Sequence, residues 1–361
     1  MGITQSLFGG GNQELLGLDI SSSAVKLLEL SRRGERYQVE AYAVETLPAN
    51  SIADKQISDI DAVGEAIGRA VSRAGTRTRQ VAVAVSGSSV ITKLIAMPAS
   101  LSEMDMEEQI KVEADQYIPY PIDEVNIDFQ ILGPTDGGGG TVDVLLAACR
   151  KEQIETLSAA LAIAGLTPKV VDVESYAMEN ACQFLTHQMP NRGRGRTVAV
   201  VDMGATTTSV IVLHDQHTIY TRDQAFGGKQ LTEDVMRNYG MVFDEAAKAK
   251  RFGNLPESYF TEVLPAFIGD MAQQIDRSLQ FFFASSSQFN SIDQIILAGG
   301  CAQVLDVDKA LEERLHIPTA VATPFSQMTI AARAKPATLA KDESSLLIAC
   351  GLAFRAFDPS V

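Results

Sequence analysis

Two short segments of this chain carry the same pattern of acidic and very small residues. Each is an apolar strand that ends in one aspartate, Asp19 or Asp202, and each runs through a turn of small residues into a second apolar strand. Small residues let backbone N–H groups approach an anion closely, and consecutive N–H groups in such a turn form an anion-binding concavity. The turn residues are Ser21, Ser22 and Ser23 in the first segment and Gly204, Ala205, Thr206, Thr207 and Thr208 in the second. The pattern predicts two loops that bind a phosphate chain.

The charged residues of both segments suit a magnesium ion and its phosphate ligands. A carboxylate repels phosphate, so we interpret Asp19 and Asp202 as metal ligands that act through the waters that Mg²⁺ keeps. Lys26 lies on the strand after the first turn and is a candidate to bring a point charge to a phosphate oxygen. Either segment alone is more simply an ordinary hairpin with a polar turn. Their recurrence favours two duplicated halves that face one polyphosphate.

A third turn extends the pattern toward a nucleotide. Gly299, Gly300 and Cys301 follow an apolar strand over 292–298 and precede a helix expected over 304–315. Glycines let the backbone approach a ligand, and the helix start offers free N–H groups. A plain strand–turn–helix junction would use the same residues, so the order of the three turns is the stronger evidence. The P-loop pattern, Gly-x4-Gly-Lys-Ser/Thr, is absent from the sequence.

This order resembles the actin, sugar-kinase and heat-shock chaperone superfamily, in which two phosphate motifs precede an adenosine motif. Further segments resemble the PilM family of type IV pilus assembly proteins, which is related to the cell-division actin homologue FtsA. These segments are 27–31, 37–45, 113–125, 142–151, 226–232, 278–283 and 347–352. The resemblance spans nearly the whole chain. It implies an α/β, actin-like ATPase fold, with two duplicated halves around a nucleotide cleft, an FtsA-type 1C insert subdomain, and ATP or ADP with Mg²⁺ as cofactors.

The resemblance also implies roles for single residues. Gly299, Gly300 and Cys301 would line the adenosine pocket, and Glu245 and Lys248 match a helix motif that touches the nucleotide in bacterial actins. An ordinary surface ion pair is the alternative for Glu245 and Lys248. Glu174 lies where related chains position the attacking water, but the proline that usually follows is absent. The resemblance therefore implies ATP hydrolysis that is slow at most, with Glu174 as the candidate catalytic residue.

Another departure concerns the first turn. Ser21 stands where related chains have a glycine, so a residue with a side chain would have to fit a position that favours positive φ.

Composition excludes several classes of partner. The 361 residues have a net charge of −15, which disfavours direct binding of nucleic acid or anionic lipid. We find no apolar run of the ~18–20 residues that a membrane-spanning helix needs, so direct membrane insertion is not expected. The four cysteines lie far apart in apolar runs, which is typical of reduced, buried thiols in a cytoplasmic protein.

The pattern of strands and helices divides the chain into four subdomains. Helices are expected over 60–74, 102–116, 152–164, 229–239, 243–250, 260–286 and 344–354, with a flexible hairpin tip at the glycine run 136–140. The resulting assignment is a first-half core (1A) of 1–87, 168–192 and 335–361, an insert (1C) of 88–167, a second-half core (2A) of 193–226 and 292–334, and a helical subdomain (2B) of 227–291.

The function that the resemblance implies is a cytoplasmic, ATP-binding scaffold of type IV pilus biogenesis, the machinery of twitching motility. Such a scaffold would bind the N-terminal cytoplasmic peptide of the inner-membrane protein PilN, in a groove between the first-half core and the insert. It would thereby lie at the inner membrane through the pilus assembly complex. The alternatives are a small-molecule kinase of the same superfamily and a homo-oligomeric, filament-forming protein.

Overall fold

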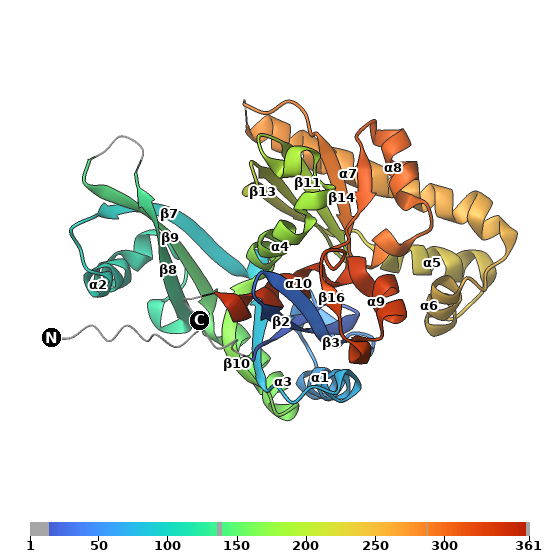
Figure 1. Cartoon of the computed structure of the whole chain (residues 1–361), viewed down its shortest axis with the longest axis horizontal. Helices are drawn as coiled ribbons and strands as arrows, with labels where there is room; N and C mark the ends of the chain where they lie inside the picture. The colour runs from blue at the N-terminus through green and yellow to red at the C-terminus, as the bar shows by residue number, and fades with distance from the viewer. Residues whose placement is uncertain (1–13, 136–138, 287, 359–361) are drawn as a thin grey trace.

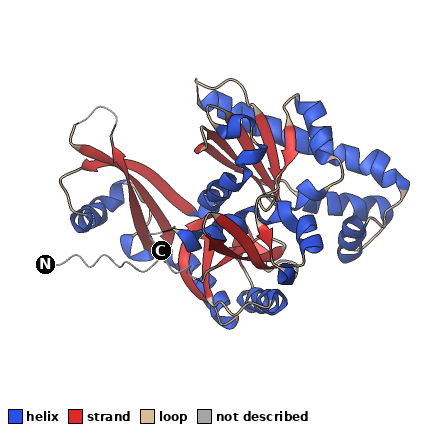
Figure 2. Ribbon diagram, viewed as in Figure 1, coloured by secondary structure: helices blue, strands red, loops and turns tan. Residues whose placement is uncertain are grey.

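The fold is described from a computed structural model, which covers residues 14–135, 139–286 and 288–358. Residues 1–13 of the predicted first-half core and residues 136–138 of the predicted glycine tip lie outside this description. The described chain is α/β, with two large mixed sheets and a smaller third sheet that projects to one side (Figure 1). Helices lie between the two large sheets and on their outer faces (Figure 2).

The first large sheet is built from the N-terminal half of the chain and one late strand. β1 runs parallel to β6 and antiparallel to β2, and β6 runs parallel to β10. The strand order across the sheet is β10 (Thr167–Val173), β6 (Gln80–Val85), β1 (Leu16–Ile20), β2 (Ala24–Arg33), β3 (Arg36–Thr46) and β16 (Thr329–Ile330). β16 joins this sheet at its edge beside β3, a few residues before the boundary at 335 that the sequence suggests.

The second large sheet repeats the pairing pattern of the first. β11 runs antiparallel to β12 and parallel to β14, as β1 does with β2 and β6. The order is β13 (His217–Gln224), β12 (Thr208–His214), β11 (Thr197–Met203), β14 (Gln294–Ala298) and β15 (Thr319–Val321). The two duplicated halves expected from the sequence are therefore confirmed.

Two helices lie between the sheets and hold the halves against each other. α4 (Glu174–Cys182) and α10 (Leu347–Phe354) share one apolar core with residues of β2 and β3 on one side and of β11, β12 and β14 on the other. A Cβ on Gly351 of α10 would lie 1.7 Å from the carbonyl oxygen of Ala177 in α4. A Cβ on Gly17 of β1 would lie 2.2 Å from the carbonyl oxygen of Ala349. Glycine therefore sets the closest approach of strand and helices.

The remaining helices cover the outer faces of the sheets. α1 (Ile60–Ala74) and α3 (Lys151–Ile163) cover the first sheet, and α5 (Gly228–Tyr239), α7 (Leu264–Ser285) and α8 (Val307–Leu315) pack on the second. α6 (Phe243–Phe252) packs beside α5, and α9 (Pro336–Asp342) precedes α10. Pro265 is the second residue of α7 and follows the π-helical turn Tyr259–Val263, so helical backbone continues on both sides of it.

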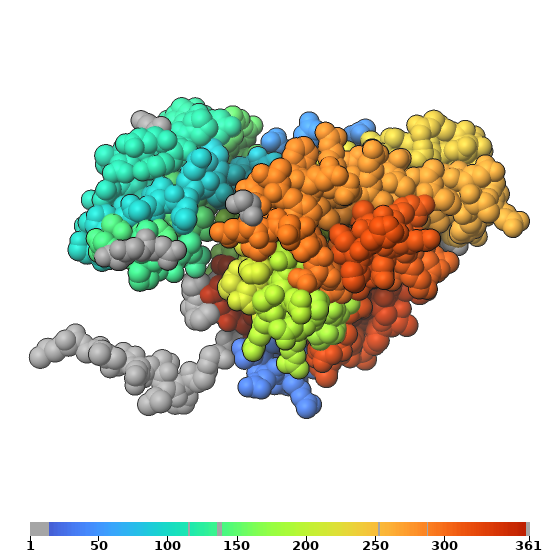
Figure 3. All heavy atoms as spheres, turned by 90° about the horizontal axis from the view of Figure 1, so that it is seen from above, coloured from blue at the N-terminus to red at the C-terminus, as the bar shows by residue number. Residues whose placement is uncertain are grey.

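The insert is a three-stranded antiparallel sheet with one covering helix. The order is β7 (Val90–Pro98), β9 (Thr141–Arg150) and β8 (Val125–Pro134), and α2 (Glu103–Glu113) packs on one face. α2 begins with a capping box, in which the side chains of Ser102 and Asp105 accept from each other's backbone N–H groups. The insert stands out from the body as a separate lobe in the space-filling view (Figure 3).

The structure confirms the prediction of buried thiols. All four cysteines are free and buried. Among the helices of residues 14–135, 139–286 and 288–358, we find none with the length and apolar character to cross a lipid bilayer.

Candidate functional site

The two aspartates occupy equivalent positions in the two sheets. Asp19 is the second-last residue of β1 and Asp202 the second-last residue of β11, and both are almost fully buried. Both carboxylates act electrostatically on Lys26, so they lie close to one another from opposite halves. The two turns predicted from the sequence therefore meet at one place.

Lys26 neutralises Asp19. The antiparallel register of β1 and β2 sets Lys26 directly opposite Asp19, and Lys26 Nζ donates to Asp19 Oδ2 over 2.9 Å. Burial lowers the pKa of Lys26, but Asp19 and Asp202 raise it, and the net direction is upward. Lys26 is therefore a permanent ammonium whose position depends on Asp19.

Asp202 has no such cation. The equivalent register of β11 and β12 sets Ser209 opposite Asp202, and Asp202 Oδ2 has no hydrogen-bond partner among the described residues. Burial raises the pKa of Asp202 to about 6, Lys26 lowers it, and Asp19 and Glu174 raise it. A buried carboxylate oxygen without a partner is the donor that a hard cation would satisfy.

The first turn is built without backbone strain. Ser21 donates from both its N–H and its Oγ to the carbonyl oxygen of Ala24, at 3.0 and 2.9 Å. No residue of this turn has a positive φ, so a serine fits the position where related chains have glycine. Ser22 is half-buried, Ser23 is exposed, and the carbonyl oxygen of Ser23 accepts from Leu47 N–H.

The second turn is tied to the start of α5. Gly228 N–H donates to the carbonyl oxygen of Gly204 at 3.0 Å, and Lys229 N–H donates to that of Ala205 at 2.8 Å. A Cβ on Gly227 would lie 2.6 Å from both of these carbonyl oxygens. Sequence reasoning missed Gly227 and Gly228 as part of the site, although two glycines before a helix were a signal that could have found them.

The threonines of the second turn differ in availability. Thr206 is exposed and Thr207 half-buried, and the carbonyl oxygen of Thr207 accepts from Gly204 N–H. Thr208 is buried and its hydroxyl donates to the carbonyl oxygen of Phe226 at 2.8 Å, so this hydroxyl serves the fold.

The third turn lies against the second. Cys301 Sγ is 3.5 Å from the carbonyl oxygen of Gly204. A Cβ on Gly299, whose φ is +85°, would lie 2.5 Å from Asp202 Oδ1 and 2.4 Å from the carbonyl oxygen of Met203. Gly300 has open space around it. The three turns predicted from separate parts of the sequence thus form one cluster.

Helix α6 contributes a lysine that the sequence did not single out. Lys250 Nζ donates to the carbonyl oxygen of Gly228 and to Thr232 Oγ1, both at 2.8 Å, and burial lowers its pKa. Lys248 is exposed, and Glu245 is exposed and accepts from Val242 N–H at its own helix start. A half-buried lysine next to exposed basic residues on the same short helix gives no sequence signal.

Glu174 begins α4 and is paired. Its Oε2 is 2.9 Å from Lys55 Nζ, and the same Nζ is 2.9 Å from Asp223 Oδ2 on β13. Burial raises the pKa of Glu174, Lys55 lowers it, and the net direction is upward. Lys55 and Asp223 were not predicted from the sequence.

The charge balance of this cluster favours a cation. Four carboxylates, those of Asp19, Asp202, Glu174 and Asp223, face two ammonium groups, those of Lys26 and Lys55. Within the described part of the chain, we find no group of three or more His, Cys, Asp or Glu side chains arranged to hold a metal. A magnesium ion here would complete its coordination with phosphate oxygens and waters, which is how Mg²⁺ is commonly bound.

A cavity of about 150 Å³ lies beside this cluster, between the first sheet and α3, next to the point where β9 of the insert ends. Lys55 and Glu174 form part of its lining. The first-half core adds Ile52, Ile57 and Val85, and Arg150, Gln153 and Leu157 line the other side.

Duplicated sheets, helices packed between them and facing aspartate turns define an actin-like ATPase fold. The family model described as type IV pilus assembly protein PilM matches residues 17–357, and the chain belongs to this family.

Comparisons with individual proteins agree with this assignment. The chain is 28% identical to a chain of the solved PilM–PilN type IV pilus biogenesis complex, with a TM-score of 0.79 over 97% of this chain and all of that one. It is 24% identical over 313 residues to the cell division protein FtsA of Streptococcus pneumoniae, a match that covers 73% of this chain and 66% of FtsA, just under two thirds of its length. An MreB of Spiroplasma citri, solved with AMPPNP bound, shares the fold with 12% identity, a TM-score of 0.51 and 97% of each chain covered.

Proposed function

We propose that this protein is a cytoplasmic, nucleotide-binding scaffold of type IV pilus assembly, which binds the N-terminal peptide of PilN and through it lies at the inner membrane. Family membership supports the role in pilus assembly. The observation that supports PilN as the partner is the similarity to the PilM–PilN complex over 97% of the chain. ATP or ADP is the nucleotide class favoured by the fold and by the meeting of the two turns.

The residues of the cleft fit a magnesium nucleotide. Asp202 supplies a buried, unpartnered carboxylate oxygen, and Asp19 supplies a second carboxylate held in place by Lys26. Mg²⁺, when bound with a nucleotide, would neutralise phosphate charge at this point. Ser21 and Gly204 already donate their N–H groups within their own turns, so Ser22 and Ser23 of the first turn and Ala205 and Thr206 of the second would contribute N–H groups and hydroxyls to the phosphates. The glycines 299–300 would leave room for the nucleoside.

We assign the partner groove to the cavity between the first sheet and α3, at the base of the insert. A volume of about 150 Å³ is the size of a cavity that accepts a benzene-sized group, so it suits one aromatic or branched aliphatic side chain of a peptide. Arg150 and Gln153 at its wall offer polar partners to the peptide backbone. An extended peptide with an apolar anchor is the physical mode that this groove supports.

Calorimetric titration tests both parts of the proposal. A synthetic PilN N-terminal peptide is titrated into the full-length protein, and MgATP is titrated separately. We expect binding in both cases, with the peptide lost in Thr156→Arg, which brings a large charged side chain into the cavity from a half-buried position outside the apolar core. Absence of peptide binding at high concentration contradicts the partner, and absence of nucleotide binding contradicts the cleft.

A further inference from the structure

One lysine joins the two halves of the molecule. Lys55 Nζ contacts Glu174 Oε2 of the first half and Asp223 Oδ2 of the second half, each at 2.9 Å. The three side chains are 17%, 19% and 33% exposed, respectively. Ion pairs that are largely removed from solvent are screened much less than surface pairs, so this contact matters for how the halves sit.

Asp223, the second-half partner of Lys55, lies in line with Asp202 across neighbouring strands of the second sheet. Asp202 on β11 is opposite Ser209 on β12, and Ser209 is opposite Asp223 on β13. Ser209 Oγ donates to Asp223 Oδ1 at 2.7 Å, which leaves Asp223 Oδ2 for Lys55. Side chains opposite one another on neighbouring strands share a face of the sheet. Asp223 is therefore positioned by the strands that position Asp202.

Lys55 lies in the turn of a short hairpin in the first half. β4 (Ile52–Ala53) pairs with β5 (Gln56–Ile57), and the two-residue turn between them is Asp54–Lys55 with φ of 48° and 62°. Turns of this kind require positive φ at both positions and favour Asn-Gly, so lysine is a strained choice there. The turn Asp215–Gln216 has the same sign of φ, so the fold tolerates this geometry elsewhere.

The contact also changes what Glu174 can do. Glu174 acts electrostatically on both Lys26 and Asp202, so it lies beside the proposed phosphate position. A carboxylate that is bonded to an ammonium group is a weaker proton acceptor, and that oxygen is not free to orient a water.

We propose that Lys55 is a positioning residue that clasps the two halves around the cleft and withholds Glu174 from hydrolysis. The clasp is defined as Lys55, Glu174 and Asp223. Its part in hydrolysis rests on the proposed nucleotide function, whereas its part in holding the halves together does not. Because Lys55 and Glu174 also line the cavity beside the insert, an occupant of that cavity touches the clasp directly.

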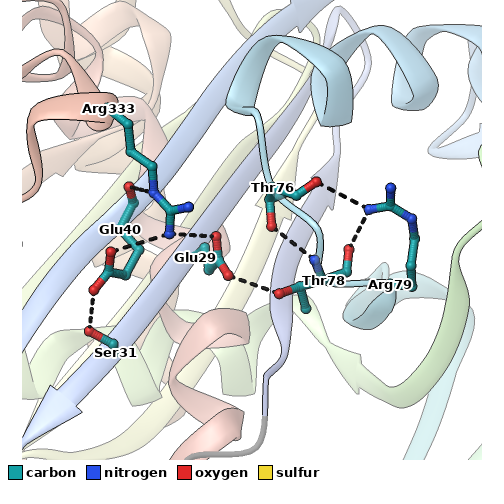
Figure 4. Close-up of polar contacts among 7 residues, drawn as sticks. All are labelled: Glu29, Ser31, Glu40, Thr76, Thr78, Arg79 and Arg333. Atoms are coloured by element: carbon teal, nitrogen blue, oxygen red, sulfur yellow. Dashed lines mark hydrogen bonds and ion pairs between the residues drawn. The ribbon is translucent and has the colours of Figure 1, made fainter.

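The chain offers a control at the edge of the first sheet, where β16 and the turn that follows it lie beside β3. Arg333 Nη2 lies 3.4 Å from Glu29 Oε2 and 3.2 Å from Glu40 Oε2, so it too is one cation between two carboxylates (Figure 4). Glu29 and Glu40 belong to neighbouring strands of the first sheet. The network continues from Glu29 to Thr78 and from Glu40 to Ser31. Arg333 is 47% exposed and Lys55 17%, so Arg333→Ala removes a cation between two carboxylates at a more exposed place that does not bridge the two sheets.

Spin labels measure the clasp in the nucleotide-free protein. Labels are placed at Glu65→Cys in α1 and Glu313→Cys in α8, both exposed, while the native cysteines are buried. We expect a narrow distance distribution in the parent protein, Lys55→Arg and Arg333→Ala, and a broader, longer one in Lys55→Ala and Asp223→Asn. A Lys55→Ala distribution that superimposes on the parent contradicts the clasp.

Nucleotide kinetics measure its second effect. We expect Lys55→Ala and Asp223→Asn to release a fluorescent ATP analogue roughly tenfold faster or more, a change worth about 1.4 kcal/mol, with Lys55→Arg and Arg333→Ala unchanged. Single-turnover hydrolysis should rise in Lys55→Ala and fall back in Lys55→Ala with Glu174→Gln. A rise that survives Glu174→Gln, or no rise, contradicts the withholding of Glu174. A parent protein that binds no nucleotide contradicts the proposed function instead, and the spin-label distances still decide the clasp.

Discussion

At the scale of single residues, the two halves use equivalent aspartates differently. Register gives Asp19 a lysine partner, whereas Asp202 has a serine opposite and a free oxygen. The two aspartates therefore have equivalent backbone positions, but only Asp19 is paired with a lysine. The unneutralised aspartate is the one that gains most from a bound cation.

Asp202→Asn tests this asymmetry through the pH dependence of stability. Burial raises the folded pKa of Asp202 from 3.8 to about 6, so ionising it costs stability as pH rises through this window, and the full cost is present above it. We expect the nucleotide-free variant to gain about 1–3 kcal/mol relative to the parent between pH 4 and pH 8. Denaturant unfolding across this pH range measures the change.

The decisive quantity is how the difference in unfolding free energy between Asp202→Asn and the parent changes with pH. Asparagine brings a buried N–H₂ group of its own, which shifts the stability of the variant equally at all pH values. If the difference in stability between parent and variant stays constant from pH 4 to pH 8, the pKa of Asp202 is not raised in the folded protein.

Gly299→Ala tests the packing of the third turn on Asp202. The added Cβ meets Asp202 Oδ1 and the carbonyl oxygen of Met203 at 2.5 and 2.4 Å, on a backbone with positive φ. We expect a loss of about 2–4 kcal/mol of stability, together with weaker nucleotide binding. Gly300→Ala, with open space around its Cβ, is the neighbouring control and should stay close to the parent in thermal unfolding. Equal effects of both changes would contradict the close contact.

The sequence predicted the site residues that lie at strand ends and in tight turns. It did not predict the lysines whose long side chains reach the site from elements farther away. Asp19, Asp202 and Gly299 were found because strand ends and tight turns leave patterns of small and apolar residues. Lys55 and Lys250 reach the site from a hairpin and a helix, and their sequence neighbourhoods look like ordinary solvated surface. The contact of Lys26 with Asp19 was missed because it depends on the register of two strands.

At the scale of elements, the repeated strand order was predictable because each half repeats the same apolar strand patterns. Helix boundaries agree closely, since α1 covers 60–74 as expected and α5 begins one residue early. The starts of three predicted helices differ from the prediction. Tyr259–Val263 forms a π-helical turn before α7, Glu343–Leu346 forms a 3-10 turn before α10, and residues 304–306 form a non-helical turn, so that α8 begins at Val307. The packing of α4 and α10 between the sheets follows from tertiary contacts that no local pattern encodes.

Gly351→Ala tests the contact between these two helices. Its Cβ would lie 1.7 Å from the carbonyl oxygen of Ala177, so α4 must move, and Glu174 at its start must move with it. We expect a loss of about 3 kcal/mol or more, measured by denaturant unfolding.

Gly68→Ala supplies the control for this change. Gly68 lies inside α1 with open space around its Cβ, so alanine should stabilise the protein by about 0.5–1 kcal/mol. A Gly351→Ala protein as stable as Gly68→Ala would refute close packing of α4 on α10.

At the scale of the whole molecule, the cleft and the insert groove share walls. Lys55 and Glu174 belong to the clasp and to the cavity lining, so the two candidate binding regions are physically continuous. Binding at one region must then alter the other if it moves these side chains, and the effect on affinity is reciprocal.

We expect the PilN peptide to bind with affinities that differ roughly fivefold or more between the nucleotide-free and MgATP-bound protein. The peptide should change nucleotide affinity by the same factor, because the coupling free energy is a property of both sites. In Lys55→Ala, the peptide affinities of the nucleotide-free and MgATP-bound protein should become nearly equal. Calorimetry in the presence and absence of each ligand measures it, and equal peptide affinities in both nucleotide states would rule the coupling out.

The central claim is that an aspartate from each half faces a metal-bound nucleotide between the two turns. Crystals grown with ATP and Mn²⁺ in place of Mg²⁺ test it, since anomalous scattering locates the metal. The account predicts a manganese peak beside Asp202 Oδ2, with the phosphates between the turns 21–23 and 204–206. A metal or triphosphate bound away from both turns would contradict it.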